Sequence, residues 1–482
     1  MKKQVYNPFL PLYEYIPDGE PHIFGDRVYL YGSHDREGGH TFCMGDYTVW
    51  SAPVDDLSDW RCEGDIYSAV QDPDYCEERK YMYAPDAVQG NDGRYYLYYC
   101  LSGEYGFGGY YGPISVAVCD TPAGKYEYLG CIRYPDGTPM KKYVCFDPCA
   151  FNDNGTIRIY YGTQYMNETN GILASDGGRL ADVMKRYNKT KEEILSTVDN
   201  VNGACMVVLE DDMLTVREEP KHIIPYDADF GGHEFFEASS MRRVGNKYYF
   251  IYSSQKNHEL CYAVSDFPDR GFEFRGTIVS NGDIGVNGVD GDCRLNMTGT
   301  THGSIIEIQG QWYVFYHRLT HKSDYSRQAC AEKIYISPDG TIAQAELTSC
   351  GLNDGWLRAE GRYPAPIACH ITNGKMPHGS NKIFRSGFPN VTNRGDERFI
   401  GEISGDVLVR YRYFSGAPEK IGICYKGSGS GSAEINGERV QLCGCGEWTD
   451  ISVQAARTGE KFDLTVNFSV DGEFELKEIY FE

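Results

Sequence analysis

The sequence has no uninterrupted apolar stretch long enough to cross a bilayer, and few segments with the apolar spacing of a helix. Its first residues, MKKQVYNPFLPLYEY, contain neither a continuous apolar core nor a small-residue cleavage site, so we expect no secretory signal. Positive charge is scarce, because 46 Lys and Arg stand against 69 Asp and Glu, for a net charge of −23. An acidic surface repels phosphate backbones and anionic lipids, which argues against nucleic acid and membranes as partners.

The sequence also lacks cysteine patterns that hold a metal ion. Its 17 cysteines are scattered, and neither the Cys443–Cys445 pair nor the Cys145–Cys149 pair has a second half with zinc spacing. Because no export signal is expected, we predict reduced thiols that pack as small apolar groups, and a cytoplasmic location. The Gly- and Asp-rich segment 283–296 does not have EF-hand spacing, so a plain loop is favoured over a structural calcium site.

Aromatic residues and glycine are abundant, with 39 Tyr and 55 Gly, which favours short strands joined by tight turns. One pattern occurs five times: a short strand, a hairpin turn containing Gly, and an aromatic strand. The five copies are Pro17–Asp35, Pro85–Cys100, Phe146–Gln164, Phe236–Ser254 and Thr301–Leu319. Four copies are followed by two further short strands. We therefore predict five units of four strands, a five-bladed β-propeller over residues 1–350.

The rest of the chain follows other patterns. Residues 180–198 have the best helical spacing, and we expect a surface helix there. From about residue 384, six short segments alternate between apolar and polar residues with Gly turns between them: 407–414, 420–427, 432–437, 447–455, 462–470 and 474–482. They predict a jelly-roll-like β-sandwich within residues 351–482. The whole protein is therefore expected to be all-β.

Each of the five copies begins with a polar residue at a similar position, and inner strands of a propeller surround one axis. These residues are Asp18, Asp86, Asp147, Glu237 and His302. Like-charged neighbours in a site that excludes water raise some carboxyl pKa values and lower others, which separates an acid from a base. Glycoside hydrolysis needs such a pair, one carboxyl protonated and one ionised.

The ordered fragments NPFLP, PDGEP, YAPD, FDP, FEAS, THG, FYHR and SRQACAEKI resemble glycoside hydrolase family 43, over roughly Asn7 to Gly351. The resemblance implies that Asp18 is the general base, that Asp147 tunes and orients the acid, and that Glu237 is the general acid. It also implies an inverting attack by water that needs no cofactor. Many members have Ala-Asp-Pro where this chain has Pro-Asp-Gly-Glu-Pro, so Glu20 is a rival for the base.

Further candidates concern substrate binding. The resemblance implies that Arg327 contacts substrate hydroxyls, with a salt bridge as the alternative. Asp86 is expected to bind a hydroxyl or to make a structural hydrogen bond, and His302 is either functional or part of the core. The loop 103–112 offers Phe107 beside three Tyr residues as a wall for a sugar ring, or as ordinary packing. Residues at the ends of aromatic strands form a second group: His34, Asp35, His317 and Arg318.

These observations predict an exo-acting enzyme that removes terminal β-D-xylosyl or α-L-arabinofuranosyl residues from plant-derived oligosaccharides. Two alternatives stay open: a retaining hydrolase of fructans and a non-catalytic sugar-binding propeller. The first would carry Asn-Asp-Pro and Glu-Cys motifs, which this chain does not have at the expected positions. The C-terminal segment resembles a family 6 carbohydrate-binding module, and it is expected either to bind sugar or to pack against the propeller. The sequence leaves the oligomeric state open.

Overall fold

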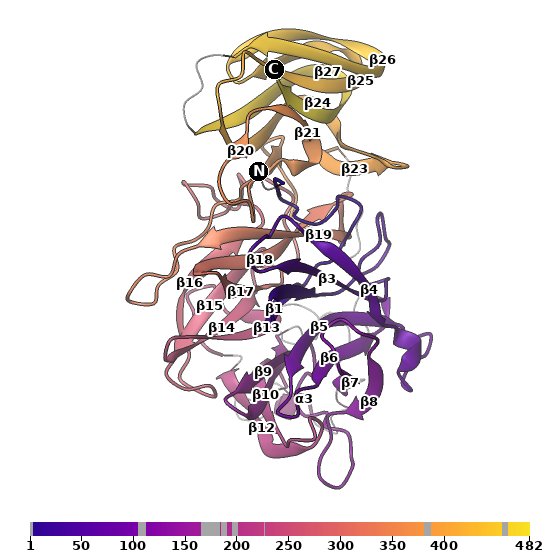
Figure 1. The fold of residues 1–482 in the computed structure, drawn as a ribbon, viewed down its shortest axis with the longest axis vertical. Helices are drawn as coiled ribbons and strands as arrows, with labels where there is room; N and C mark the ends of the chain where they lie inside the picture. Colours follow the sequence, from indigo (N-terminus) through magenta and orange to yellow (C-terminus); the bar gives the residue numbers. More distant parts are fainter. Residues whose placement is uncertain are drawn as a thin grey trace.

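The computed structural model describes residues 3–104, 112–164, 184, 190–194, 201–225, 227–379, 387–455 and 461–482. Figure 1 shows a large body of sheets, coloured from indigo to pink, and a smaller stack of long yellow strands at one end of it. The large body is the propeller and the smaller one is the C-terminal β-sandwich. The predicted all-β fold, a five-bladed propeller followed by a sandwich, is confirmed.

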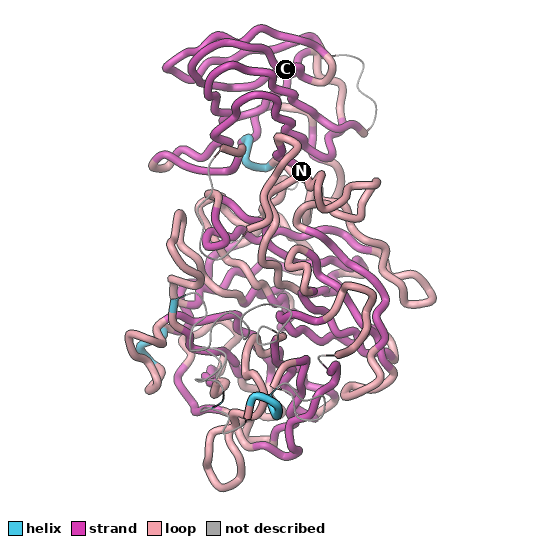
Figure 2. The backbone as a smooth tube through the Cα atoms, turned by 180° about the vertical axis from the view of Figure 1, so that it is seen from behind, coloured by secondary structure: helices cyan, strands magenta, loops and turns pink. Residues whose placement is uncertain are grey.

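Helix is confined to a few short turns in the described part of the chain, as Figure 2 shows from behind. These are α3 (Lys191–Ile194) and the 3-10 turns η1 (Ala69–Gln71) and η3 (Ala365–Ile367). Of the predicted helix over 180–198, only residues 184 and 190–194 are described, and the rest lies outside the described residues. Within the described ranges, no helix has both the length and the apolar character that a membrane span requires.

Each of the first four blades is an antiparallel sheet of four strands in chain order. Blades one and two contain β1 (Glu20–Phe24), β2 (Arg27–Tyr31), β3 (Tyr47–Pro53), β4 (Arg61–Tyr67), β5 (Tyr81–Gln89), β6 (Tyr95–Ser102), β7 (Ser115–Cys119) and β8 (Glu127–Cys131). Blades three and four contain β9 (Cys149–Asp153), β10 (Thr156–Thr163), β11 (Gly203–Leu209), β12 (Val216–Pro225), β13 (Phe235–Val244), β14 (Lys247–Ser254), β15 (Glu259–Ser265) and β16 (Glu273–Ser280).

The fifth blade has three strands, so the prediction of four strands per unit was wrong for it. The three are β17 (Ser304–Ile308), β18 (Gln311–Thr320) and β19 (Ser323–Ile334). The start of the chain runs along β19 instead. The Phe9 N–H donates to the Ala329 carbonyl at 3.3 Å, and the Asn7 amide donates to the Ala331 carbonyl at 2.8 Å. The N-terminal segment thus covers the edge of the last blade and joins the two ends of the ring.

The apolar core of the propeller lies between neighbouring blades. Between blades two and three, for example, Tyr98, Ile159 and Val207 belong to one buried cluster. Alternate residues of a strand face opposite blades, which explains why strands rich in Tyr, Val and Ile are buried on both faces. The inner strands β1, β5, β9, β13 and β17 neighbour one another in that order around the axis.

The C-terminal sheet has its own core and longer strands than predicted. Its strands are β20 (Leu357–Arg358), β21 (Gly361–Pro364), β22 (His370–Thr372), β23 (Asn390–Arg394), β24 (Glu397–Ser415), β25 (Lys420–Ile435), β26 (Glu438–Gln454) and β27 (Phe462–Phe481). The predicted strands at 420–427 and 432–437 belong to the single strand β25, which ends at Ile435, and those at 462–470 and 474–482 belong to β27, which ends at Phe481. The separating glycines are sites of close approach. A Cβ at Gly429 or Gly472 would lie 1.9 or 2.1 Å from a carbonyl oxygen of the other strand.

A buried ion network joins the sandwich to the propeller. His370 of β22 and Arg412 of β24 contact the Asp283 carboxylate, at 2.8 and 3.2 Å. The other Asp283 oxygen accepts a hydrogen bond from the Leu347 N–H at 2.9 Å. Asp283 is the first residue of segment 283–296, for which the sequence favoured a plain loop over a calcium site. Its carboxylate ties β22 and β24 to the loop after β16.

Candidate active site

The three carboxylic residues predicted as catalytic lie at the beginnings of inner strands. Asp18 is two residues before β1, Asp147 is two residues before β9, and Glu237 is the third residue of β13. The backbone is left-handed at Asp18 and Asp147, with φ of +58° and +46°. It is also left-handed at Ala238, and the pairing of β13 with β14 shifts register on both sides of Glu237. L-residues adopt such conformations at a cost, and they gather where function requires a particular side-chain direction.

Asp18 is buried but stays ionised because a guanidinium group lies against it. The Arg327 Nη1 donates to Asp18 Oδ1 at 2.8 Å, and both side chains are about 95% buried. Burial alone would raise the pKa of the Asp18 carboxyl, but the charge of Arg327, together with smaller contributions from other neighbouring polar groups, holds the pKa below its usual value. Asp18 is therefore a carboxylate at neutral pH.

His317 fixes the backbone of Asp18 without sharing its charge. The His317 Nε2 lies 2.7 Å from the Thr300 carbonyl oxygen, so this nitrogen carries the proton. The Nδ1 then accepts the hydrogen bond from the Asp18 N–H at 3.3 Å. Burial and the neighbouring Arg327 lower the pKa of His317 to about 3. The imidazole is therefore neutral, and its 3.5 Å approach to the Asp18 carboxylate is not an ion pair.

Arg327 is itself held by Asp35, which lies after β2. Its Nε and Nη2 donate to the two Asp35 oxygens at 2.8 and 3.0 Å, a bidentate arrangement that fixes the plane of the guanidinium. The Cys43 N–H and the Arg327 N–H donate to the same carboxylate, at 3.0 and 3.1 Å. The Phe42 ring lies 4.9 Å from the guanidinium carbon. Arg327 therefore bridges Asp35 and Asp18, and most of its donors are engaged.

Glu237 and Asp147 have the opposite electrostatic state from Asp18. Burial and the negative charge of Asp18 raise the pKa of Glu237 to about 8. Burial, Glu237 and Asp18 raise the pKa of Asp147 well above its usual value. These mutual effects require the three groups to be near one another. Asp147 Oδ2 also accepts a hydrogen bond from the Ala238 N–H at 3.2 Å, so it fixes the backbone beside Glu237.

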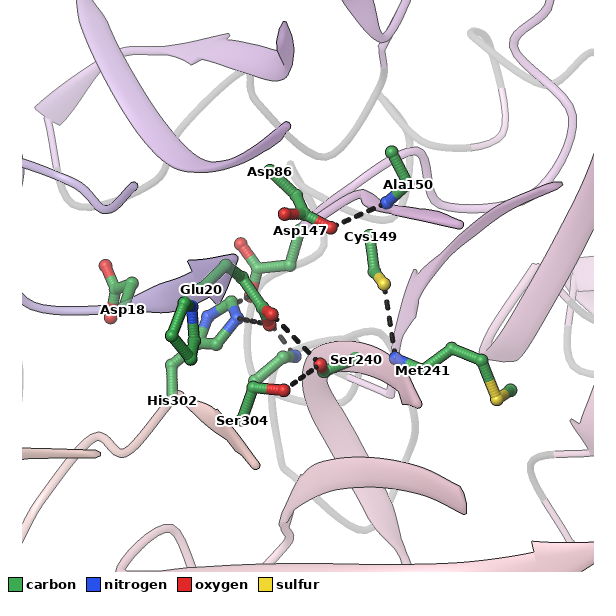
Figure 3. A network of polar contacts seen from close by, with 12 residues as sticks. Asp18, Glu20, Asp86, Asp147, Cys149, Ala150, Ser240, Met241, His302 and Ser304 are labelled. Carbon is green, nitrogen blue, oxygen red and sulfur yellow. Dashed lines mark hydrogen bonds and ion pairs between the residues drawn. The ribbon is translucent and has the colours of Figure 1, made fainter. Parts of the chain in front are cut away.

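Figure 3 shows how His302 and Glu20 lie beside Asp18 and Asp147. His302 Nδ1 is 3.7 Å from Asp147 Oδ2, and its Nε2 is 3.9 Å from Glu20 Oε1. Glu20 points toward Ser240, whose hydroxyl donates to Glu20 Oε2 at 3.1 Å. The Arg242 guanidinium donates to the same oxygen at 2.5 Å. Both candidates are ion-paired, but burial raises the pKa of Glu20 to about 7, whereas the pKa of Asp18 is lowered. This difference favours Asp18 as the ionised base.

Asp86 is wholly buried, and its oxygens already have partners. Its Oδ1 lies 2.6 Å from His22 Nε2 and accepts from the Ala87 N–H at 2.8 Å. Its Oδ2 accepts from the Ala150 N–H at 2.8 Å, which ties β5 to β9. These contacts favour the structural hydrogen bond over substrate binding.

Of the two other predicted binding residues, only His34 is described, and it contacts other groups. His34 lies 2.9 Å from Glu14 Oε1 and 2.9 Å from the Asp46 carbonyl oxygen. Phe107 and the three Tyr residues near it lie outside the described residues. The predicted wall for a sugar ring therefore stays a prediction.

Arg242 and Phe42 are site neighbours that the sequence reasoning missed. Arg242 is two residues after Ser240, so strand alternation places both on one face of β13, and this signal was available. Phe42 lies in the connection between β2 and β3, and no pattern identified it. Its contact with Arg327 depends on tertiary structure alone.

Two groups in the described part of the chain have donor atoms close enough to share a metal ion: Glu20, His22 and Asp86, and His233, Glu259 and Cys261. A cationic side chain contacts each group. Arg242 pairs with Glu20, and Lys256 lies 3.8 Å from Glu259. Each group is thus hydrogen-bonded and contacted by a cation from within the protein. The prediction about calcium stays a prediction.

A five-bladed propeller that holds an ionised carboxyl and a protonated carboxyl at its axis has the equipment of a glycoside hydrolase. The sequence profile of Glycosyl hydrolases family 43 matches residues 7–206 and 187–342. The chain therefore belongs to this family and is a glycoside hydrolase.

Similar proteins cover most of the chain. A "Xylosidase/arabinosidase" from Thermoclostridium stercorarium is 43% identical over 432 residues, which are 86% of this chain and 84% of that protein. The structure of a family 43 enzyme from Xanthomonas citri, complexed with xylotriose, is 25% identical with a TM-score of 0.53, over 71% of this chain and 94% of that one. An arabinoxylan arabinofuranohydrolase from Bacillus subtilis shares the fold over 98% of this chain and 97% of that one, at 17% identity and a TM-score of 0.50.

Proposed function

We propose that this chain is an inverting exo-glycosidase that removes terminal β-D-xylosyl or α-L-arabinofuranosyl residues from short plant-derived oligosaccharides. The observation that carries the proposal is the opposite electrostatic state of two neighbouring carboxyl groups. Asp18 is ionised, while Glu237, with a pKa of about 8, is protonated at neutral pH. The printed name of the 43% identical relative supports the choice of sugars.

In this mechanism Glu237 donates its proton to the glycosidic oxygen as the bond to the anomeric carbon breaks. Asp18 takes a proton from the water molecule that attacks the same carbon from the opposite face, so the product has the inverted configuration. Arg327 keeps Asp18 ionised before the reaction. Asp147 holds the backbone next to Glu237 and thereby aims the acid. The three roles account for the three carboxyl groups.

The stereochemistry of the product tests this mechanism. Proton NMR of a fresh reaction with an aryl β-D-xyloside, whose leaving group has no anomeric proton, is expected to show α-xylose first, followed by mutarotation. Initial β-xylose would indicate retention and contradict the mechanism. Xylohexaose is expected to give only xylose and xylopentaose at early times, because an exo-enzyme acts at chain ends. Early xylobiose, xylotriose or xylotetraose would indicate endo action. A panel of chromogenic pentosides and galactosides tests the sugar preference.

We also propose that the enzyme needs no cofactor and works in the cytoplasm on imported oligosaccharides. The reaction requires two carboxyl groups and water, and both carboxyl groups are supplied by this chain. All 17 cysteines are free, and several are exposed, among them Cys62, Cys293 and Cys443, which suits a reducing compartment. The rate of hydrolysis should survive dialysis against EDTA. A loss of rate that one added cation restores would contradict the proposal that no cofactor is needed. Fractionation of the source cells tests the location.

A further inference from the structure

One tryptophan of this chain is exposed, and it stands at a pocket away from the catalytic cluster. Of the five Trp residues, all within the described ranges, Trp356 alone is in contact with solvent over a large part of its surface, at 44%. Burial of a Trp contributes strongly to stability, so an exposed indole in a concave site is unusual and suggests a ligand. The pocket measures about 290 Å³.

Three segments that are distant in the sequence form this pocket. They are the N-terminal residues 3–5, the turn 56–58 between β3 and β4, and residues 352–358, which lead into β20. Figure 1 shows the N-terminus beside β20, at the junction of the propeller with the sandwich. Most of the lining side chains are polar and able to bond hydroxyl groups: Gln4, Asp56, Ser58, Asn353, Asp354 and Arg358. The pocket shares no residue with the Asp18, Asp147 and Glu237 cluster.

The walls of the pocket are held in place by their own hydrogen bonds. Asn353 Oδ1 accepts from the Val5 N–H at 3.3 Å, and its amide donates to the Gly355 carbonyl at 2.8 Å. Asp56 Oδ1 accepts from the Ser58 N–H at 3.1 Å and from its hydroxyl at 2.7 Å. A pocket with fixed loops loses little conformational entropy when a ligand binds.

The indole ring of Trp356 is itself positioned from one side. The Tyr413 ring meets it edge to face, with 5.3 Å between centroids. The Lys461 Nζ lies 4.4 Å from the Trp356 centroid and 3.5 Å from the Tyr413 centroid. Beside these neighbours, Trp356 keeps 44% of its surface exposed and lines the pocket. A flat aromatic face beside hydroxyl-binding groups suits a sugar ring, whose C–H bonds stack while its hydroxyls bond.

We propose that this pocket, called here the Trp356 pocket, binds a pentose unit of a xylan-type chain as a second, non-catalytic site. The identity of the sugar rests on the proposed function, whereas the presence of a sugar site rests on the pocket itself. A second site would hold the longer oligosaccharides on the enzyme after each cleavage and raise their effective concentration at the axis. The effect should therefore grow with the length of the oligosaccharide and be absent with small aryl glycosides.

Affinity electrophoresis in gels containing soluble arabinoxylan tests the proposal. All samples carry Glu237→Gln, so that the polysaccharide is not consumed. The retardation of each variant gives its dissociation constant for arabinoxylan. We expect Trp356→Ala to raise this constant about five- to tenfold, since loss of stacking costs on the order of 1 kcal/mol. Trp356→Phe keeps a ring and should lose less. Tyr335→Ala is the matched control, because Tyr335 is 70% exposed and does not line the pocket.

A second measurement uses the unmodified side chain and does not depend on how Trp356→Ala folds. Arabinoxylan should protect indole fluorescence from acrylamide in the Glu237→Gln protein, and this protection should be smaller in the same protein with Trp356→Phe. With Glu237 restored, Trp356→Ala should turn over aryl β-xylosides at the unmodified kcat/KM. The proposal would be overturned if all variants were retarded equally, if Tyr335→Ala lost as much affinity for arabinoxylan as Trp356→Ala, or if the parent protein were not retarded at all. Failure of the proposed function would appear separately, as no turnover of aryl pentosides.

Discussion

The propeller axis and the core of the C-terminal sheet are both built from strands, but they bury opposite kinds of side chain. The axis buries charge: Asp18, Arg327 and Asp35 are at most 5% exposed. The core of the C-terminal sheet is a continuous apolar cluster in which Phe414, Ile423 and others are fully buried. Charged groups lose hydration when they are buried, and only mutual hydrogen bonds and ion pairs offset this loss.

The difference shows that buried polarity, rather than strand architecture, marks the functional region. In the C-terminal sheet, burial of side chains contributes directly to the free energy of unfolding. At the axis, burial shifts the pKa values of the carboxyl groups and fixes the directions of their side chains. Glu332 sharpens this contrast, because burial raises its pKa to about 8, as for Glu237, yet it lies apart from the acid and base. It accepts hydrogen bonds from Thr348 and Asn7, which fasten the N-terminal segment.

The largest effect is expected from Glu237→Gln, which removes the acid while preserving its shape. The kcat/KM for xylobiose should fall about 10²- to 10⁴-fold, the usual contribution of a general acid. An aryl xyloside with a good leaving group should lose much less. The matched control is Glu332→Gln, which should lower the melting temperature and leave kcat/KM near its original value. Similar rate losses in both variants would remove the distinction between the two buried carboxyls.

In the C-terminal core, Phe414→Ala should act on stability alone. The Phe414 ring packs against Phe481 and Tyr363, at 4.7 and 5.4 Å between centroids. Deleting a buried aromatic ring typically costs about 3–5 kcal/mol of unfolding free energy. Urea unfolding measures this loss, and kcat/KM below the transition should not change. Phe267→Ala is the control, since Phe267 is 48% exposed. A large drop in kcat/KM for folded Phe414→Ala would show that the sandwich acts on the site.

At the axis, Arg327→Lys should lower activity by about 10- to 100-fold, because one ammonium cannot replace the fork that bonds Asp35 and Asp18 together. With the positive charge less well placed, the pKa of Asp18 should rise toward its usual value. The acidic limb of kcat/KM should therefore move to higher pH. An increase in KM with an unmoved acidic limb would instead support the predicted contact of Arg327 with substrate. Arg243→Lys, on the half-exposed outer part of β13, is the control.

The smallest effects are those of pH on the unmodified protein. Glu237 must be protonated to act, so kcat/KM should fall as pH rises through about 8. The pKa values of Glu237 and Glu332 are both raised from 4.5 to about 8, so the folded state holds protons that the unfolded state has lost between these values. The contribution of these groups to stability is therefore present at low pH and lost as pH rises toward 8.

Urea unfolding at pH 5, 6.5 and 8 measures this dependence. Glu332→Gln should reduce the fall in unfolding free energy and leave the alkaline limb of kcat/KM in place. Glu237→Gln should also reduce the fall in unfolding free energy, and it should abolish the alkaline limb of kcat/KM. If the alkaline limb moved in Glu332→Gln, its titration would have to be assigned to more than Glu237.

Local patterns in the sequence were sufficient to predict the propeller but not every strand. Five recurring hairpins identified five blades, because hairpin turns and strand alternation are local properties. The fifth blade was predicted with one strand too many, since its edge is covered by the N-terminal segment through contacts such as that of Phe9 with Ala329. Gly429 and Gly472 looked like turn residues, yet they lie where two long strands approach closely. Glycine serves both purposes, and only the position of the other strand distinguishes them.

By itself the sequence determined which residues carry the carboxyl groups and placed Asp18, Asp147 and Glu237 at equivalent positions of repeated units. It also determined the family. Only the tertiary structure decided that Arg327 lies against Asp18, that Glu20 is paired with Arg242, and that the hydrogen bonds of Asp86 are made within the protein. The physical reason is that a pKa depends on burial and on the distance to other charges. Groups three hundred residues apart acquire that distance only when the ring closes.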